Sequence, residues 1–319
     1  MRLLAVAAAL LLAGCSTPAR TTPGPATPSA QSPTVQVRRA KAAKAPKVLV
    51  IGLDGVRYDR MLEARIPYLR EMMRSGTLAT GLLDLPNHVK SVSGPGWATV
   101  LTGVEPEKHG VYDNSFNGRK FTKYPDFLTR IEKLRPRLST VAVAAWRSLL
   151  ETGAVGALVD WHATTHNQTY ARGAKDALII RRMTEILRTR QVDVAFLHLD
   201  TVDSTAHRMG AMGQEYLDAI DTMDASIGRL FAAIRARPGF AAEDWTVIVT
   251  TDHGHKDQGG HGGRSDIERG VFVLAAGPGI PQGLMRDGVR LVDVAATVFG
   301  QMGLPLPKEL TGKSLAISR

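Results

Sequence analysis

Short apolar runs alternate with amphipathic stretches along the chain from about residue 47 onward. Apolar runs bounded by turn residues predict buried strands at 47–54, 139–146, 155–160, 192–200, 245–253 and 270–277. Apolar positions that recur every three or four residues predict helices at 67–76, 175–190, 215–239 and 290–303. Because these strands are apolar on both faces, the pattern predicts an α/β fold with a mostly parallel central sheet flanked by helices.

The first 46 residues do not follow this pattern. Residues 1–15, MRLLAVAAALLLAGC, contain one arginine and an apolar run too short to span a bilayer, which predicts an export signal. The ending Leu-Ala-Gly-Cys resembles a bacterial lipoprotein signal, and this implies lipidation of Cys15 and a membrane-anchored protein on the cell envelope. A plain signal peptide with an incidental cysteine is the alternative.

Residues 16–46 hold six prolines and have no apolar periodicity, which predicts an extended tether. Residues 47–319 then have the length expected for one domain. Cys15 is the only cysteine, so no disulfide can form within the chain.

The net charge of +10, from 40 basic and 30 acidic residues, is unevenly distributed. Residues 1–45 contain six basic and no acidic residues, which leaves 34 basic and 30 acidic residues, a net charge of +4, in the rest. The basic cluster from Arg38 to Lys47 lies in the tether, where it can contact anionic lipid headgroups. The near balance elsewhere argues against a nucleic-acid-binding groove.

Three predicted strands end in aspartates: Asp54, the pair Asp200 and Asp203, and Asp252. In an open parallel sheet, ligand sites form beyond the carboxyl ends of the strands, so these acids are expected to face one crevice. Each aspartate alone could equally be a helix cap or a turn residue.

Histidines accompany these acids. Asp203 and His207 are four residues apart and would share one helical face. His253 directly follows Asp252, and His261 lies between two glycines further along the same loop. His255 is a rival ligand in the same loop. Mixed carboxylate and imidazole ligands suit divalent metals such as zinc. The sequence therefore predicts two metal sites, one from Asp203, His207 and His261 and one from Asp54, Asp252 and His253.

Ser93 stands in a Gly/Pro-rich turn, SGPGW, just before a segment that reads as the start of a helix. A helix start carries partial positive charge and unpaired N–H groups, which favour a developing oxyanion. Two metals about 3.5–4 Å apart would activate such a hydroxyl for an in-line displacement. Ser93 is thus the predicted nucleophile, with an ordinary turn or cap serine as the alternative.

Several motifs carry a family resemblance: IGLDGVR, SGPGWATVLTGVEPEKHGVYDN, DSTAH, TDHGH, GGHGG and the tail DVAATVFGQMGLPLPKELTGKSL. In this order, over about residues 47 to 315, they resemble the alkaline phosphatase superfamily, most closely its nucleotide pyrophosphatase/phosphodiesterase branch. The resemblance implies two metal ions, usually zinc, one held by Asp54, Ser93, Asp252 and His253 and the other by Asp203, His207 and His261. It also implies hydrolysis of a small phosphate ester, a diester rather than a monoester, through a phosphoseryl intermediate.

Two departures from that branch concern the nucleophile. Thr-Phe-Pro-Asn-His is typical there, whereas residues 93–97 read Ser-Gly-Pro-Gly-Trp. Gly96 replaces the asparagine, so other groups must contact the phosphate oxygens, with Asn114 and His162 as candidates. Trp97 is either a wall for the substrate or an ordinary core residue.

Two other functions remain open at this level. The chain could be a sulfatase or phosphonate hydrolase of the same superfamily, or a surface lipoprotein that binds a ligand without turnover. Sulfatases of the superfamily convert a Cys or Ser in a Cys/Ser-x-Pro-x-Arg context to formylglycine. Because Trp97 occupies the arginine position, Ser93 is expected to stay a serine.

Overall fold

The computed structural model describes residues 43–165 and 173–317, together with Gly24. Strands form one sheet in the order β4-β3-β5-β1-β6-β7-β2-β8. Their bounds are β1 Ala45–Leu53, β2 Gly76–Leu82, β3 Thr140–Ala144, β4 Trp161–Thr164, β5 Val194–Leu199, β6 Glu243–Thr250, β7 Gly270–Ala276 and β8 Leu284–Asp287. Strand β7 runs antiparallel to both neighbours, and the other neighbouring pairs are parallel. The predicted α/β class with a mostly parallel sheet is confirmed.

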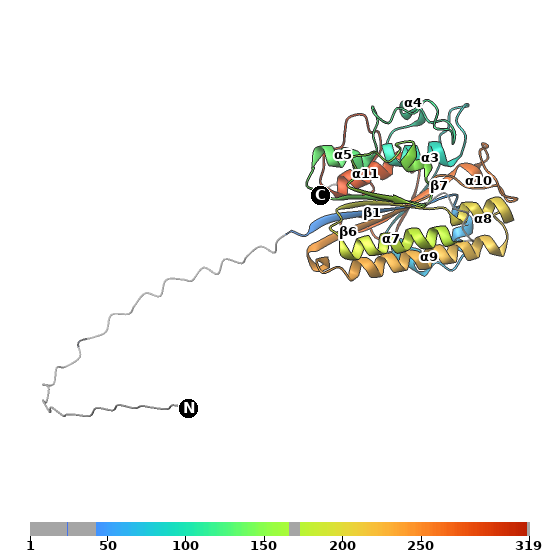
Figure 1. Ribbon diagram of the computed structural model, residues 1–319. Coiled ribbons are helices and arrows are strands. Elements are labelled where there is room, and N and C mark those ends of the chain that lie inside the picture. Colours follow the sequence, from blue (N-terminus) through green and yellow to red (C-terminus); the bar gives the residue numbers. More distant parts are fainter. Residues whose placement is uncertain (1–23, 25–42, 166–172, 318–319) are drawn as a thin grey trace, which may run out of the picture. The chain divides into compact units, whose positions relative to one another are not determined.

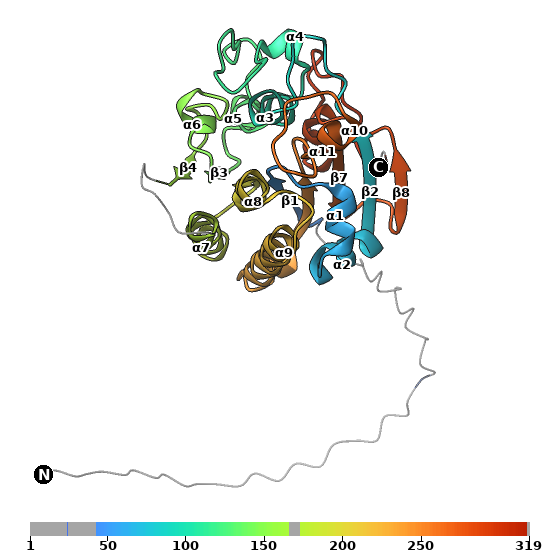
Figure 2. The ribbon, with the colours of Figure 1, turned by 90° about the vertical axis from the view of Figure 1, so that its right-hand side faces the viewer.

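Helices cover both faces of this sheet (Figures 1 and 2). On one face lie α3 Ser93–Thr102, α5 Phe127–Leu134 and α11 Val292–Gln301, and on the other α2 Pro67–Ser75, α7 Ala174–Thr189 and α9 Gln214–Arg235. The shorter helices are α1 Tyr58–Glu63, α4 Pro106–His109, α6 Ser148–Glu151, α8 Thr201–Met209 and α10 Asp266–Arg269, with a 3₁₀ turn at Phe240–Ala242.

Strand β1 shows why its sequence is continuously apolar. Val48 and Val50 pack into the core beneath α3 and α11, whereas Leu49 and Ile51 pack into the core on the α7 and α9 side. All four are fully buried, and burying each such side chain stabilises the fold by about 1.5–3 kcal/mol. A central strand between two helical layers therefore has no polar face.

The strand predicted over 155–160 is wrong. Val155 and Val159 are buried, but they lie in a bend and a loop, and the N–H of Gly156 donates to the carboxylate of Asp126 at 2.9 Å instead of to a strand. The apolar run reflects the burial of loop side chains in the core. The strand that pairs with β3 begins just after it, at Trp161.

The amino-terminal predictions fall mostly outside the described residues. Cys15 and nearly all of the tether predicted over 16–46 lie there, and β1 begins at Ala45, two residues before the predicted start of the domain. Among the described residues, no helix has the length and apolar character needed to cross a bilayer.

Candidate active site

Three aspartates meet where β1, β5 and β6 end. These strands are parallel neighbours, so their carboxyl ends lie at the same edge of the sheet, on the side seen in Figure 2. Asp54 directly follows β1, Asp203 lies in the first turn of α8 after β5, and Asp252 comes two residues after β6. All three are buried.

One cluster of metal-type donor atoms surrounds Asp203. The side chains of Asp203, His207, His255 and His261 each place a donor atom within 4.8 Å of the others. His255 Nε2 lies 2.8 Å from an Asp203 carboxylate oxygen, and His261 Nε2 lies 3.0 Å from His207 Nε2. The structure thus brings both rival histidines, His255 and His261, to the same place.

A second cluster contains Asp54, Asp252 and His253, again with donor atoms within 4.8 Å of one another. His253 Nε2 lies 3.3 Å from Asp252 Oδ2 and 3.5 Å from Asp54 Oδ1. The Ser93 hydroxyl adjoins this cluster, 3.3 Å from Asp54 Oδ1 and 3.2 Å from His253 Nε2. The His253 and His261 rings stack with their centroids 3.8 Å apart, so the two clusters are contiguous.

Backbone carbonyls determine which ring nitrogen of two histidines faces the clusters. His253 Nδ1 lies 3.0 Å from the carbonyl oxygen of Gly254, and His261 Nδ1 lies 3.0 Å from that of Ser91. A carbonyl oxygen only accepts, so Nδ1 carries the proton in both rings. Nε2 therefore presents a lone pair to the clusters, as a metal ligand requires.

Ser93 occupies the first position of α3, and glycines allow its surroundings to close. A Cβ on Gly96 would lie 2.8 Å from the Asp252 side chain, and a Cβ on Gly94 would lie 2.5 Å from the carbonyl oxygen of Asp113. The first turn of α3 thus approaches Asp252 so closely that no side chain fits at position 96. This explains why the chain has glycine where the resemblance leads one to expect asparagine.

Two first-turn amides of α3 are already paired and are not free for an oxyanion. Gly94 N–H donates to Asn114 Oδ1 at 2.7 Å, and Gly96 N–H donates to the Val92 carbonyl at 3.3 Å. Asn114 therefore stands beside the serine with its amide nitrogen left to donate. His162, the other candidate, is exposed on β4. Among the described residues, no hydrogen bond or ion pair joins it to either cluster.

Trp97 is a core residue that positions Asp54, so its interpretation as a substrate wall is wrong. The indole is fully buried, and its N–H donates to Asp54 Oδ2 at 2.9 Å. His198 Nε2 approaches the same oxygen at 3.0 Å. Burial raises the pKa of Asp54, but the hydrogen bond and charge of His198 outweigh this and hold that pKa below its usual range. Oδ2 is thus engaged by protein donors, while Oδ1 faces Ser93.

Sequence reasoning missed His198. It is the one polar residue within the apolar strand β5, VAFLHL, and its side chain is fully buried. A histidine inside a buried strand needs a hydrogen-bond partner, which is the signal that could have drawn attention to it.

The pKa values of the other two aspartates and of two histidines are shifted in opposite directions. Burial, followed by the charge of Asp54, raises the pKa of Asp203 to about 8 and raises the pKa of Asp252 well above its usual value. Burial, followed by neighbouring imidazoles, lowers the pKa of His253 well below its usual value and that of His261 to about 4. Neutral imidazoles beside crowded carboxylates favour a bound cation.

The donor set fits two divalent metal ions. Asp252 Oδ2 is buried and has no hydrogen-bond partner among the described residues, although an unpartnered buried carboxylate oxygen is costly. The clusters offer carboxylate oxygens and imidazole nitrogens, a mixture that suits zinc and related metals better than calcium.

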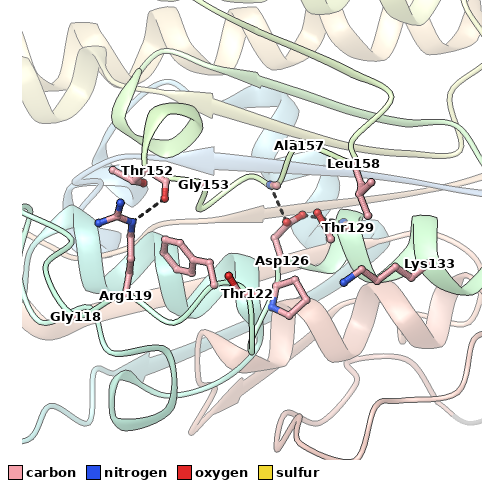
Figure 3. Close-up of a pocket in the computed structure, with 13 residues that line it drawn as sticks. Gly118, Arg119, Thr122, Asp126, Thr129, Lys133, Thr152, Gly153, Ala157 and Leu158 are labelled. Carbon is pink, nitrogen blue, oxygen red and sulfur yellow. Dashed lines mark hydrogen bonds between the residues drawn. The ribbon is translucent and has the colours of Figure 1, made fainter.

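A separate cavity lies apart from the two donor clusters. It measures about 570 Å³ and is lined by residues of 118–133 and 152–158, among them Arg119, Asp126 and Lys133 (Figure 3). No residue of either donor cluster lines it. We therefore locate the candidate active site by its metal-type donor atoms and not by this cavity.

Comparison with known proteins agrees with this arrangement. The model of the family "Type I phosphodiesterase / nucleotide pyrophosphatase" matches residues 48–261, more than half of the chain. The chain belongs to this family. The matched range contains every aspartate and histidine of the two clusters, and the superfamily suggested by the motifs is confirmed.

Individual relatives of this phosphodiesterase family member are distant. Bis(5'-adenosyl)-triphosphatase ENPP4 of Bos taurus is 25% identical over 228 residues, 67% of this chain and 49% of the relative. A 2,3-bisphosphoglycerate-independent phosphoglycerate mutase of Synechocystis is 34% identical over 113 residues, 32% of this chain and 20% of the relative. The chain thus spans about a fifth to a half of the length of these curated relatives.

Solved structures share the fold. Murine ectonucleotide pyrophosphatase/phosphodiesterase 5, in an inactive form in complex with AMP, superposes with a TM-score of 0.58 at 15% identity. The match covers 82% of this chain and 96% of that chain. At this identity the likeness shows the fold alone, which is the alkaline-phosphatase-like arrangement predicted from the sequence.

Proposed function

We propose that this protein is an exported, lipid-anchored hydrolase of phosphodiesters that uses Ser93 as its nucleophile. The observation that carries the proposal is the position of the Ser93 hydroxyl. It stands at the start of α3, within 3.3 Å of Asp54 and His253, beside two contiguous clusters of metal-type donors. The family match and the bovine triphosphatase relative support a diester or pyrophosphate substrate.

In the proposed reaction, Ser93 Oγ forms a bond to phosphorus while the bond from phosphorus to the leaving oxygen breaks. The serine proton ends on the departing alcohol, and the enzyme holds a phosphoseryl ester. Water then attacks phosphorus, the Oγ–P bond breaks, and a phosphate monoester leaves as Ser93 regains its proton. Asn114, placed by Gly94 N–H, would donate to a nonbridging phosphoryl oxygen, and the positive end of α3 favours the added negative charge.

Two divalent ions, zinc in our proposal, would be held by Asp203, His207, His255 and His261 and by Asp54, Asp252 and His253. When bound, they would lower the pKa of the serine hydroxyl and neutralise charge on the phosphoryl oxygens. Trp97 and His198 hold Asp54 so that only one of its oxygens faces Ser93.

The nucleophile is tested by Ser93→Ala, assayed with a panel of monoesters, diesters and sulfate esters. We expect the variant to fold, to keep its metal content and to lose turnover by about 10³-fold or more, because the covalent step has no nucleophile. The unmodified protein, quenched during turnover, should show phosphoserine at Ser93 by peptide mass analysis. A formylglycine mass at that position, a preference for sulfate esters, or near-normal turnover by the variant would contradict the proposal.

The export and anchoring part of the proposal comes from the sequence. The leader of residues 1–15 and the proline-rich segment 16–46 would place the hydrolase on the cell envelope, attached through Cys15. The folded body would then work outside the cytoplasm.

A further inference from the structure

Five arginines lie at the edge of the sheet opposite to the candidate active site. All are exposed, and none forms an ion pair with another described residue: Arg135, Arg137, Arg188, Arg190 and Arg235. They occur where α5, α7 and α9 end, in the segments that lead into the parallel strands β3, β5 and β6. Because these strands and β1 are neighbours in the sheet, their starts lie side by side. We call this surface the arginine edge.

Buried ion pairs join these segments into one surface. Asp193, ahead of β5, pairs with Lys47 of β1 at 2.5 Å and also accepts from a backbone N–H ahead of β3 at 2.7 Å. Arg237 pairs with Glu243 of β6 at 2.8 Å and donates to the carbonyl oxygen of Arg190 at 3.1 Å. These two acids are thus neutralised inside the fold, while the five arginines are exposed, one of them, Arg190, lying over the Trp161 ring at 4.7 Å from its centroid.

The chain enters the folded body at this edge. Strand β1 starts here at Ala45, so residues 1–42, which carry three cations between positions 38 and 41 and no acid, attach here. Leu134 and Phe240, at the ends of the same segments, are 39% and 37% exposed. Exposed cations mixed with apolar side chains suit the headgroup layer of an anionic bilayer.

We propose that the arginine edge is a docking surface for an anionic phospholipid bilayer. Nucleic acid is the less favoured partner, because a basic segment preceded by an apolar leader enters at this edge and apolar side chains accompany the arginines. The donor clusters lie at the other end of β1, about 30 Å away for nine residues at about 3.3 Å each. A docked protein would therefore open its active site toward water and toward soluble substrates.

The test uses the full chain carrying Cys15→Ser, so that lipidation cannot contribute to binding. Cosedimentation is measured with phosphatidylcholine vesicles that contain or lack phosphatidylglycerol. In this background, Arg135→Gln, Arg188→Gln and Arg235→Gln are combined and compared with a control that combines Arg65→Gln, Arg70→Gln and Arg286→Gln. The control removes the same number of exposed charges from other surfaces.

We expect binding to anionic vesicles that is lost at high salt and is absent without phosphatidylglycerol. At about fivefold per arginine near an anionic surface, the edge variant should bind on the order of 100-fold more weakly, and the control should change far less. Equal binding by the two variants would overturn the proposal. The arginines would then serve only to stabilise the carboxyl-terminal ends of their helices through the helix dipole. Tighter binding to duplex RNA than to anionic vesicles would overturn it as well.

Discussion

At the scale of single residues, the site depends on which carboxylate oxygens are already held by hydrogen bonds within the protein. Asp54 uses Oδ2 to accept from Trp97 and His198 and keeps Oδ1 toward Ser93. A Cβ on Gly52 would lie 2.5 Å from the Trp97 ring, so the glycine allows the indole to pack against β1. The position of one carboxylate thus depends on an indole, an imidazole and a missing side chain.

This arrangement predicts the effect of Trp97→Phe. The variant keeps an aromatic ring but removes the N–H donated to Asp54, so the carboxylate is less well oriented. We expect affinity for the metals to fall by about 10–100-fold and turnover at limiting metal to fall with it.

Chelator-competition titration of zinc measures this affinity. Phe299→Leu, which alters another fully buried aromatic residue that belongs to neither donor cluster, is the control for lost core packing. Equal zinc affinity in Trp97→Phe and the unmodified protein would show that the indole hydrogen bond does not position Asp54.

At the scale of elements, α4 supports the helix that carries Ser93, the proposed nucleophile. Val111 N–H donates to His109 Nδ1 at 3.1 Å, so the ring proton lies on Nε2, which is 3.1 Å from the Thr99 hydroxyl. That hydroxyl donates in turn to the carbonyl of Pro95 at 2.8 Å, two residues after Ser93. Through these hydrogen bonds, the four-residue helix α4 holds the first turn of α3 in place.

The buried ring of His109 predicts a pH dependence. Burial lowers the pKa of His109 to about 3, so between pH 6.5 and 3 the unfolded chain binds a proton that the folded protein does not. Stability contributed by the neutral ring is therefore complete above pH 6.5 and is lost as pH falls, by about 2–3 kcal/mol at pH 4.5.

His109→Gln does not titrate, so its free energy of unfolding should fall less steeply in acid than that of the unmodified protein. Urea denaturation from pH 7.5 to 4.5 measures the difference between the two curves. Parallel curves would mean that the imidazole gains its proton in the folded state without cost.

At the scale of the whole molecule, charge separates between the two edges of the sheet. Carboxylates gather where the parallel strands end, and arginines gather where they begin. The first set is buried, so the metal ions of the proposed function would contribute to stability as well as to activity.

Metal removal should therefore destabilise the protein. Two sites, each at about 100 times its dissociation constant, would contribute about 5 kcal/mol together. For a body of this size, that corresponds to a fall in Tm of about 10 °C or more when a chelator strips the ions. Differential scanning calorimetry before chelation, after it and after zinc is restored checks this. An unchanged Tm in protein confirmed to be metal-free would contradict the metal assignment.

Cys15→Ser tests the proposed anchor. Because the donor clusters and Ser93 lie in the folded body, the variant should move from the membrane fraction to the soluble fraction after a high-salt wash and keep its turnover on soluble diesters. Mass analysis of the native amino terminus should show a lipid on Cys15. An unlipidated chain that starts at another residue would refute the anchor.

The sequence by itself determined the fold class and the acids at the strand ends. Apolar runs flanked by turns mark central strands, and parallel topology carries Asp54 and Asp252 to one edge whatever the details of packing. The four-residue spacing of Asp203 and His207 sets one face of α8 in the same way. These features depend on local periodicity or on a general rule of sheet geometry, so they could be predicted.

Only the tertiary structure decided the rest. It joined His255 and His261 in one cluster, assigned Trp97 and His198 to Asp54, required glycine at position 96, and turned the apolar run at 155–160 into buried loop. Each of these outcomes depends on atoms that the chain brings together from distant positions, such as Asp54 and His198. Periodicity records which side chains are buried, whereas contact between distant segments determines what each buried group meets.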